Sequence, residues 1–264
     1  MTHTAKPLSG QNAIVTGAAR GIGAAIAIAL AKAGANVAVN DLNSATETVS
    51  ACKAEGVQAV EALGDVGNLA AVESIMDAAE QQLGPLDILV SNAAFSDREL
   101  FYQADLAGFE KTIQVCMWGP YYLSRLMAQR LITLGKKGSM VFIGSPHAYK
   151  AIPGSCAYNM AKAALDQLAR TAACELAEHR IRVNIVHPGW TDTPGERKFF
   201  HESELKEQGS QLPLGRMAEP EDIAHAVLFL CHPASEYMTG STVTVDGGAL
   251  LPFQEMFRVR NRPN

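Results

Sequence analysis

The sequence predicts an α/β fold, in which a parallel β-sheet is covered by helices on both faces. Short apolar runs alternate with longer helical patterns from one end of the chain to the other. Strand–helix repetition of this kind builds parallel sheets. The 264 residues, 48% of them hydrophobic, contain no linker-like or low-complexity segment, so we expect a single domain over residues 1–264.

The expected elements follow one another in order along the chain. Strands are expected at residues 12–16, 36–40, 58–63, 88–91, 139–144, 182–187 and 242–245. Helices are expected at residues 21–33, 44–55, 69–83, 106–134, 156–177 and 220–230. Pro120 should kink or interrupt the fourth of these helices. Residues 190–215 fit neither the helical nor the strand spacing of apolar residues. We therefore expect an irregular segment there, which such a fold most often uses as a substrate loop.

Composition and charge exclude several classes of partner and site. The formal net charge is −5 with both signs interspersed, which argues against nucleic acid or an anionic membrane as a partner. The polar start lacks the apolar core of a signal peptide, and no apolar run is long enough to span a bilayer. Five scattered cysteines and seven histidines show no metal-type spacing. We therefore expect a cytoplasmic protein with reduced thiols and no metal.

A glycine-rich turn follows the first expected strand. Gly17, Gly21 and Gly23 have the spacing G-x-x-x-G-x-G and open an apolar helix. Glycines let the backbone approach a pyrophosphate, and the helix N-terminus offers free N–H groups to it. The turn therefore indicates a dinucleotide site, although its spacing differs from the general G-x-G-x-x-G.

Asp41 ends the second expected strand, where a carboxylate can accept hydrogen bonds from an adenosine ribose diol. A carboxylate there would repel a 2′-phosphate, so NAD is the expected cofactor and NADP is less favoured. Arg20 keeps NADP open, because a guanidinium near that ribose could bind the 2′-phosphate. The alternative for Asp41 is a cap on the helix that follows it.

Tyr158 and Lys162 lie four residues apart in an expected helix, with Ser145 upstream. Residues at this spacing share one face of the helix. Lowering a phenol pKa from near 10 to about 7 requires about 4 kcal/mol, which an adjacent ammonium is able to supply. The arrangement points to proton transfer at a hydroxyl or carbonyl, but the same spacing alone is also typical of simple packing.

Taken together, these motifs closely resemble those of the short-chain dehydrogenase/reductase family. The turn from Thr16 to Gly23 resembles its TGxxxGIG motif, and Tyr158 to Lys162 resembles its YxxxK motif. The other matching segments, in family order, are Gly64-Asp65-Val66, Ser91-Asn92-Ala93-Ala94, Arg182-Val183-Asn184 with Pro188-Gly189, and Asp246-Gly247-Gly248. The resemblance implies a Rossmann-like doubly wound sheet of seven parallel strands and a homotetramer or homodimer built on paired long helices.

The resemblance also implies a role for each matching residue. Tyr158 would be the general acid/base, Lys162 would lower its pKa and hold the nicotinamide ribose, and Ser145 would hydrogen-bond the reacting oxygen while a hydride moves. The expected cofactor-binding residues are Gly17, Arg20, Gly21, Ile22, Gly23, Asp41, Asp65, Val66, Asn92, Ala93, Tyr158, Lys162, Pro188, Gly189, Thr191 and Thr193.

One position departs from the family pattern. Cys116 stands where the family has an Asn whose main-chain carbonyl is thought to hold a water of the proton relay. Because a carbonyl survives any substitution, we expect the three-residue unit to remain and leave its fourth partner open. A small buried cysteine is the favoured interpretation of this side chain, and a reactive thiol is the alternative.

The expected function is NAD(P)-dependent interconversion of a secondary alcohol, on a sugar, polyol or related compound, and its carbonyl. Local segments resemble bacterial glucose and polyol dehydrogenases of the family, and the expected substrate-site residues are Arg98, His147, Tyr149, Cys156 and Trp190. A 3-oxoacyl carrier-protein reductase is the alternative enzyme, disfavoured by Asp41. A non-catalytic nucleotide sensor would not need Ser145, Tyr158 and Lys162. Charges in residues 190–215 also fit a solvated surface, and the C-terminal tail, residues 252–264, could cover a subunit contact.

Overall fold

A computed structural model describes residues 6–198 and 200–251 of the chain. Within them one sheet of seven parallel strands has the order β3-β2-β1-β4-β5-β6-β7. The strands are β1 (Asn12–Thr16), β2 (Asn36–Asn40), β3 (Ala59–Glu61), β4 (Ile88–Ser91), β5 (Gly138–Ile143), β6 (Ile181–Pro188) and β7 (Thr242–Val245). The order reverses between β1 and β4, where such sheets bind ligands at their carboxyl ends. The predicted fold is confirmed.

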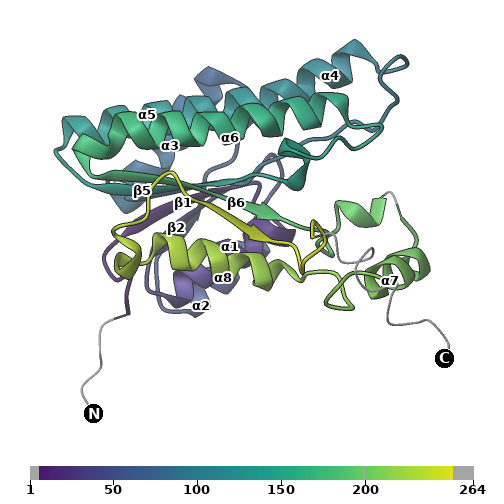
Figure 1. Cartoon of the computed structure of the whole chain (residues 1–264). Helices are drawn as coiled ribbons and strands as arrows, with labels where there is room; N and C mark the ends of the chain where they lie inside the picture. The colour runs from purple at the N-terminus through teal and green to yellow at the C-terminus, as the bar shows by residue number, and fades with distance from the viewer. Residues whose placement is uncertain (1–5, 199, 252–264) are drawn as a thin grey trace, which may run out of the picture.

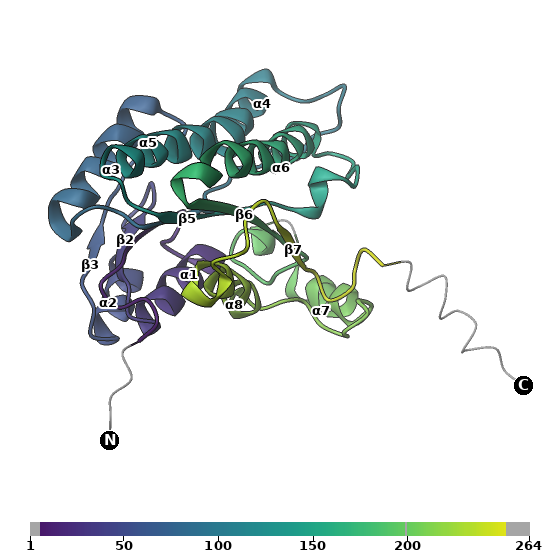
Figure 2. The ribbon, with the colours of Figure 1, turned by 60° about the vertical axis from the view of Figure 1, so that its left-hand side comes forward.

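Helices form a layer on each face of this sheet (Figures 1 and 2). The helices are α1 (Gly21–Lys32), α2 (Thr46–Ala54), α3 (Leu69–Leu83), α4 (Leu106–Ile113), α5 (Gly119–Thr133), α6 (Cys156–Leu176), α7 (Glu202–Ser210) and α8 (Pro220–Cys231). Two apolar clusters fill the space between the layers. One packs α1 and α8 against the sheet, and the other packs α3, α5 and α6 against the opposite face.

The predicted strand at residues 58–63 is shorter in the structure. Only Ala59–Glu61 pairs, because β3 is an edge strand with β2 as its single neighbour. The other strands agree with the prediction to within one residue at each end. The shortening leaves the sheet order unchanged.

The predicted long helix over residues 106–134 is divided by a π-helical turn, Gln114–Trp118. Pro120 lies in the first turn of α5, directly after it. Proline lacks the N–H that would bond the carbonyl of Cys116, four residues earlier, in an α-helix. The chain therefore stays helical through Pro120, and the altered bonding falls just before it.

The prediction that residues 190–215 are irregular throughout is wrong, because the segment contains α7. Leu205 and Gly209 are the buried residues of this helix and lie one turn apart. The Glu204 carboxylate accepts the backbone N–H of His201 at 2.8 Å, at the start of the helix. Two buried positions in a helix of nine residues leave too weak a helical period to detect in the sequence. The expected C-terminal tail, residues 252–264, lies outside the described residues.

In the described part of the chain, no helix is long and apolar enough to cross a membrane. Across residues 6–198 and 200–251 there is also no group of three or more His, Cys, Asp and Glu side chains arranged to hold a metal ion.

Candidate active site

The glycine-rich turn lies at the carboxyl end of β1 and leads into α1. Gly17 and Gly21 have φ angles of 61° and 59°, in the left-handed region that favours glycine. A Cβ on Gly23 would lie 2.3 Å from the Gly17 carbonyl oxygen and 2.6 Å from the Asn92 amide nitrogen. No side chain caps the start of α1, so its N–H groups face outward unneutralised. This cradle fits a pyrophosphate.

Asn92 and Ala93, which were expected to bind the cofactor, brace this turn from β4. The backbone N–H groups of Asn92 and Ala93 donate to the Thr16 hydroxyl at 3.0 and 3.1 Å. The Asn92 amide donates to the carbonyls of Thr16 and Gly17 at 2.9 and 3.0 Å. Thr16 was missing from the predicted site residues, and its signal was the first position of the TGxxxGIG motif.

Asp41 does not cap α2, so that alternative is wrong. Its carboxylate accepts the backbone N–H of Ala19, inside the glycine turn, and that of Asn43, each at 3.1 Å. Glu61 is bonded near the start of α2 instead, where it accepts the Ala45 N–H at 2.6 Å. The Asp41 carboxylate thus lies against the turn, where the ribose of a bound dinucleotide was expected, and Arg20 is exposed beside it.

Two further residues that were predicted to bind the cofactor, Asp65 and Val66, lie in the loop after β3. The Asp65 carboxylate accepts the backbone N–H of Gly67 at 2.8 Å. Val66 is buried, and a Cβ on Gly119 would lie 3.1 Å from its side chain. Any adenine contact of Val66 would therefore fall to its main chain, because the side chain belongs to the core.

The segment after β6 comes back against the glycine turn. The Gly189 N–H donates to the Val245 carbonyl at 2.8 Å, which continues the pairing that ends at Pro188. The Thr191 hydroxyl donates to the Gly189 carbonyl at 3.1 Å. A Cβ on Gly21 would lie 3.6 Å from the Thr193 side chain. The structure thus brings two distant sets of predicted cofactor residues together.

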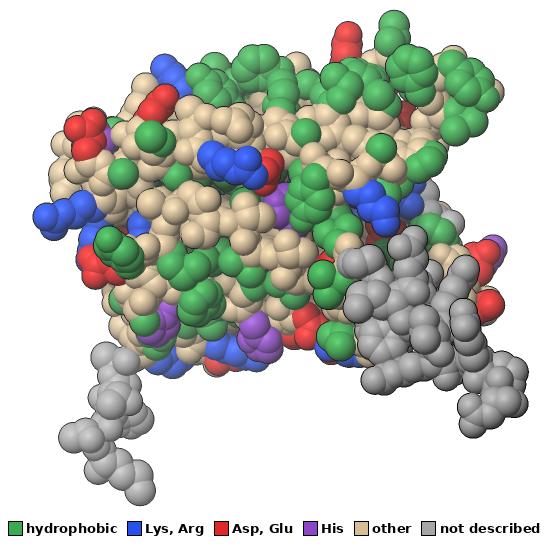
Figure 3. Space-filling model, in the orientation of Figure 1, with side chains coloured by type: hydrophobic (Ala, Val, Ile, Leu, Met, Phe, Trp, Pro, Cys, Tyr) green, Lys and Arg blue, Asp and Glu red, His purple; other side chains and the backbone are tan. Residues whose placement is uncertain are grey.

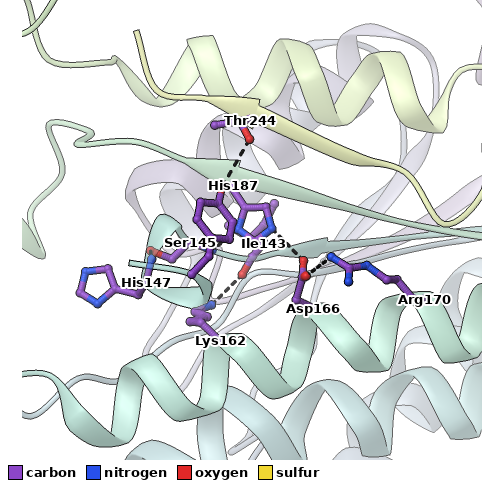
Figure 4. Close-up of polar contacts among 9 residues, drawn as sticks. Ile143, Ser145, His147, Lys162, Asp166, Arg170, His187 and Thr244 are labelled. Carbon is purple, nitrogen blue, oxygen red and sulfur yellow. Dashed lines mark hydrogen bonds and ion pairs between the residues drawn. The ribbon is translucent and has the colours of Figure 1, made fainter. Parts of the chain in front are cut away.

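Ser145, Tyr158 and Lys162 meet where β5 ends above α6. Ser145 follows β5, and its side chain lies close enough to Tyr158 to lower the pKa of the phenol. The Lys162 ammonium donates to the Ile143 carbonyl at 2.6 Å (Figure 4). The same ammonium lies 5.3 Å from the centre of the Tyr158 ring. The three side chains form one group at the carboxyl ends of the strands.

The surroundings of Tyr158 shift its pKa in both directions. Burial raises this pKa above its ordinary value, and the charge of Glu196 raises it further. The Ser145 hydrogen bond and the charge of Arg98 act in the opposite direction but do not overcome burial. Burial also lowers the pKa of Lys162, whose ammonium faces a carbonyl. The phenol therefore holds its proton at neutral pH.

Three predicted substrate residues gather near Tyr158. The His147 ring centre lies 5.1 Å from that of Tyr158, and its Nδ1 lies 2.6 Å from Asn159 Oδ1. Burial lowers the pKa of His147, which favours the neutral imidazole. Arg98 and Trp190 both donate to the Glu196 carboxylate, at 2.8 and 3.1 Å. Glu196 thus joins the loop after β4 to residues 190–215.

The other two predicted substrate residues lie differently. The Tyr149 hydroxyl is 3.4 Å from the Thr244 hydroxyl of β7, and its ring centre lies 5.3 Å from that of His187. The Cys156 sulfur lies 3.9 Å from that of Met160, which is exposed. Tyr149 therefore borders the group through His187, whereas Cys156 faces the outer side of α6.

Cys116 is fully buried beneath the loop after β4. Its sulfur accepts the Phe95 N–H at 3.3 Å and lies 3.2 Å from the Phe95 carbonyl oxygen. Burial raises the pKa of this thiol. A buried, protonated thiol is inert, so the structure supports the buried-cysteine interpretation rather than a reactive one.

Sequence and structure comparisons place the chain among known oxidoreductases. A family model described as enoyl-(acyl carrier protein) reductase matches residues 17–249. An L-rhamnose 1-dehydrogenase (NAD(P)(+)) of a Sphingomonas species is 33% identical over 253 residues, covering 94% of this chain and 100% of the relative. A 2,3-dihydro-2,3-dihydroxybenzoate dehydrogenase of Bacillus subtilis is 36% identical over 258 residues, covering 94% and 98%.

A solved structure from Agrobacterium tumefaciens, described as a candidate 2-deoxy-D-gluconate 3-dehydrogenase with bound NADP, has a TM-score of 0.86. It is 31% identical in sequence and covers 94% of this chain and 99% of its own. The match extends over the sheet, the glycine turn and the Tyr–Lys helix alike. The chain therefore belongs to the short-chain dehydrogenase/reductase family, whose members are NAD(P)-dependent oxidoreductases acting on CH–OH groups.

Proposed function

We propose that this enzyme interconverts a secondary alcohol of a sugar, polyol or related compound and its carbonyl, with Tyr158 carrying the proton. The observation that supports it most is the meeting of Ser145 and Tyr158 beside the buried Lys162, whose ammonium lies 5.3 Å from the centre of the Tyr158 ring. This group lies at the carboxyl ends of the strands, on the same edge of the sheet as the glycine cradle.

In reduction, the protonated Tyr158 phenol donates its proton to the carbonyl oxygen of the substrate, while the Ser145 hydroxyl holds that oxygen. A nicotinamide cofactor held at the glycine turn would supply the hydride for reduction and accept it in oxidation. The Lys162 ammonium stabilises the negative charge that develops on the phenol as its proton leaves. In oxidation, the same phenol oxygen receives the proton of the alcohol.

The Cys116 main chain supports a water-mediated resupply of that proton. Pro120 has no N–H, so the Cys116 carbonyl cannot form the usual α-helical bond to the fourth residue after it. A carbonyl freed in this way can hold a water near Lys162, whatever side chain the residue carries.

The choice of a hydroxyl-rich substrate rests on the surroundings of Tyr158. His147, Arg98 and Glu196 all lie close enough to influence each other or the phenol electrostatically. Hydrogen-bonding side chains of this kind suit a substrate with several hydroxyls. Two of the relatives above are named for sugars or sugar acids, which agrees with this choice.

Replacing Tyr158 with Phe tests the role of the phenol. We expect kcat to fall by about 100- to 10,000-fold, because the proton carrier is lost, while the Kd for the nucleotide stays within a few-fold. Turnover is measured by the absorbance of the reduced nicotinamide, with sugars, polyols, steroids and acyl thioesters as substrates. Undiminished turnover would contradict the assignment. Selective turnover of acyl thioesters would favour a 3-oxoacyl carrier-protein reductase. Nucleotide binding without turnover of any substrate would favour a nucleotide sensor.

We propose NAD as the preferred cofactor, on the position of Asp41 against the glycine turn. Its negative charge disfavours a 2′-phosphate at that place. Asp41→Ala should narrow or reverse the ratio of kcat/KM for NAD to that for NADP. Asn43→Ala, which leaves the carboxylate in place, is the matched control. An unchanged ratio in Asp41→Ala would show that this carboxylate does not select the cofactor.

We also infer that the chain assembles as a homodimer or homotetramer through α4 and α5. Leu106 is 75% exposed and Tyr121 is 41% exposed. Figure 3 shows hydrophobic side chains gathered over these helices. An apolar face of this kind is usually covered by a partner. Sedimentation should show a single oligomer that dissociates in Leu106→Glu, and a monomeric wild-type protein would contradict the inference.

A further inference from the structure

A buried chain of polar contacts leads from Ser145 away from the proposed site. The Ser145 backbone N–H donates to His187 Nδ1 at 2.8 Å, and His187 Nε2 lies 3.0 Å from Asp166 Oδ1 (Figure 4). The other oxygen of Asp166 accepts from the Arg170 guanidinium. The His187 side chain is fully buried. None of the roles proposed above uses His187 or Asp166.

The contact with Ser145 determines the protonation state of His187. A backbone amide can only donate, so Nδ1 must be the unprotonated nitrogen of the ring. Nε2 then carries the proton and donates it to the Asp166 carboxylate. Both nitrogens are satisfied in one orientation of a neutral ring, and the structure admits no flipped or doubly protonated form with these contacts.

The His187 side chain forms its hydrogen bond just after the last backbone bond between β5 and β6. The Gly144 N–H donates to the Val186 carbonyl at 2.7 Å, as a ladder bond would. The next residues are Ser145 and Pro146, and proline has no N–H to continue the ladder. The Ser145 N–H bonds the side chain of His187, so a residue of β6 holds the chain where it leaves β5.

Ser145 is thereby tied to α6 at two places. Tyr158, Lys162, Asp166 and Arg170 follow one another at four-residue intervals and share one face of α6. The Ser145 hydroxyl lies beside Tyr158 and lowers the pKa of its phenol, and the Ser145 N–H is held through His187 by Asp166, two turns further along the helix. The two links close a ring of contacts that sets the hydroxyl of Ser145 relative to the phenol.

Gly144 makes room for this arrangement. A Cβ on Gly144 would lie 2.7 Å from both Nδ1 and Cε1 of His187. Tyr149 covers the ring, with ring centres 5.3 Å apart. The imidazole is therefore confined from the strand side and from the loop side, and its contacts cannot shift without moving Ser145.

We propose that His187 and Asp166 are positioning residues, which hold Ser145 in the place from which its hydroxyl meets Tyr158 and the reacting oxygen. This proposal rests on the proposed function, because it assigns to the ring a purpose in that reaction. It predicts that the Nδ1 acceptor matters more to turnover than the volume of the ring does.

Two substitutions of His187 test the contacts of its two ring nitrogens one at a time. Asn places an amide oxygen near the position of Nδ1, so His187→Asn keeps an acceptor for the Ser145 N–H. Gln reaches the position of Nε2, so His187→Gln keeps the contact with Asp166 and leaves that N–H without an acceptor. We expect kcat to fall about 100-fold in His187→Gln and less than about 10-fold in His187→Asn, with nucleotide Kd unchanged. His225→Gln, at an exposed position of α8, is the control.

Activity and stability should rank these variants in opposite order. Gln fills more of the buried space, so His187→Gln should melt at a higher temperature than His187→Asn while turning over more slowly. A role in packing alone predicts that the better-packed variant is also the more active one. That result would overturn the proposal.

A double-mutant cycle with Ser145 completes the test. If His187 acts through Ser145, His187→Gln should cause no further loss of kcat in the Ser145→Ala background. Equal losses in both backgrounds would show that the ring serves something else. Gly144→Ala displaces the His187 ring but keeps every polar group. It should likewise cause no further loss of kcat in the Ser145→Ala background, and it replaces His187→Gln in the cycle if that variant does not fold. No loss in Ser145→Ala or Tyr158→Phe would instead contradict the proposed function.

Discussion

The two sides of the candidate active site are built in different ways. On the nucleotide side, the glycine turn is held by backbone geometry and by partly buried hydrogen bonds that Asn92 donates to Thr16 and Gly17. On the substrate side, residues 190–215 are held to the loop after β4 by Glu196. The paired side chains of Arg98 and Glu196 are 32% and 25% exposed.

The difference indicates which side of the site can change. A backbone cradle in which a Cβ collides with main-chain atoms tolerates almost no substitution. A partly exposed ion pair contributes at most about 1 kcal/mol and can be exchanged for other contacts. The relatives are named for different substrates, which agrees with a substrate side that can change.

The largest effect is expected from Gly23→Ala on the nucleotide side. The new Cβ would lie 2.3 Å from the Gly17 carbonyl oxygen, so the turn must deform. We expect the Kd for NAD, measured by calorimetry, to rise at least about 100-fold, or about 2.8 kcal/mol. Gly195→Ala is the control on the substrate side, because its nearest atom would be 3.5 Å away. An equal rise of the Kd for NAD in Gly23→Ala and Gly195→Ala would contradict the difference between the nucleotide side and the substrate side.

An intermediate effect is expected from Thr16→Val. The change removes the acceptor for the N–H groups of Asn92 and Ala93. Loss of an acceptor for two partly buried donors should lower the free energy of unfolding by about 1–3 kcal/mol. Thermal melting measures this loss, and Thr16→Ser, which keeps the hydroxyl, should melt near the wild type. An unchanged melting temperature in Thr16→Val would mean that the brace from β4 is unimportant.

The smallest effect is expected from Glu196→Gln on the substrate side. The amide keeps an acceptor for Trp190 but loses the charge that pairs with Arg98. We expect KM to change by up to about 5-fold, or about 1 kcal/mol, with the Kd for NAD and the melting temperature unaltered. A loss of nucleotide binding would show that the two sides are coupled rather than separate.

Much of the fold could be predicted because its signals are local. The strands, the helix beginning at Leu69 and the glycine turn each depend on short runs of residues. The helix Glu202–Ser210 could not be predicted, because only Leu205 and Gly209 mark its buried side. The π-turn before Pro120 also escaped prediction, since the proline indicates a disturbance but not how the chain accommodates it.

The candidate site, like the fold, could be predicted only in part from the sequence. Spacing placed Tyr158 and Lys162 on one face of a helix, but it could not show what surrounds the two side chains. In the structure, burial raises the pKa of Tyr158, and the Lys162 ammonium donates to the Ile143 carbonyl. The proposed catalytic and cofactor roles stay predictions until the variants above are measured.

The sequence by itself determined the fold class, the family and the residues on which chemistry could depend, because these are written in periodicity and in short motifs. Only the tertiary structure decided how those residues are held. His187 and Asp166 lie far apart from Ser145 in sequence, and nothing local relates them. They meet because parallel pairing brings the ends of β5 and β6 together and α6 packs against β6. Contacts between distant segments arise from packing, which no local pattern records.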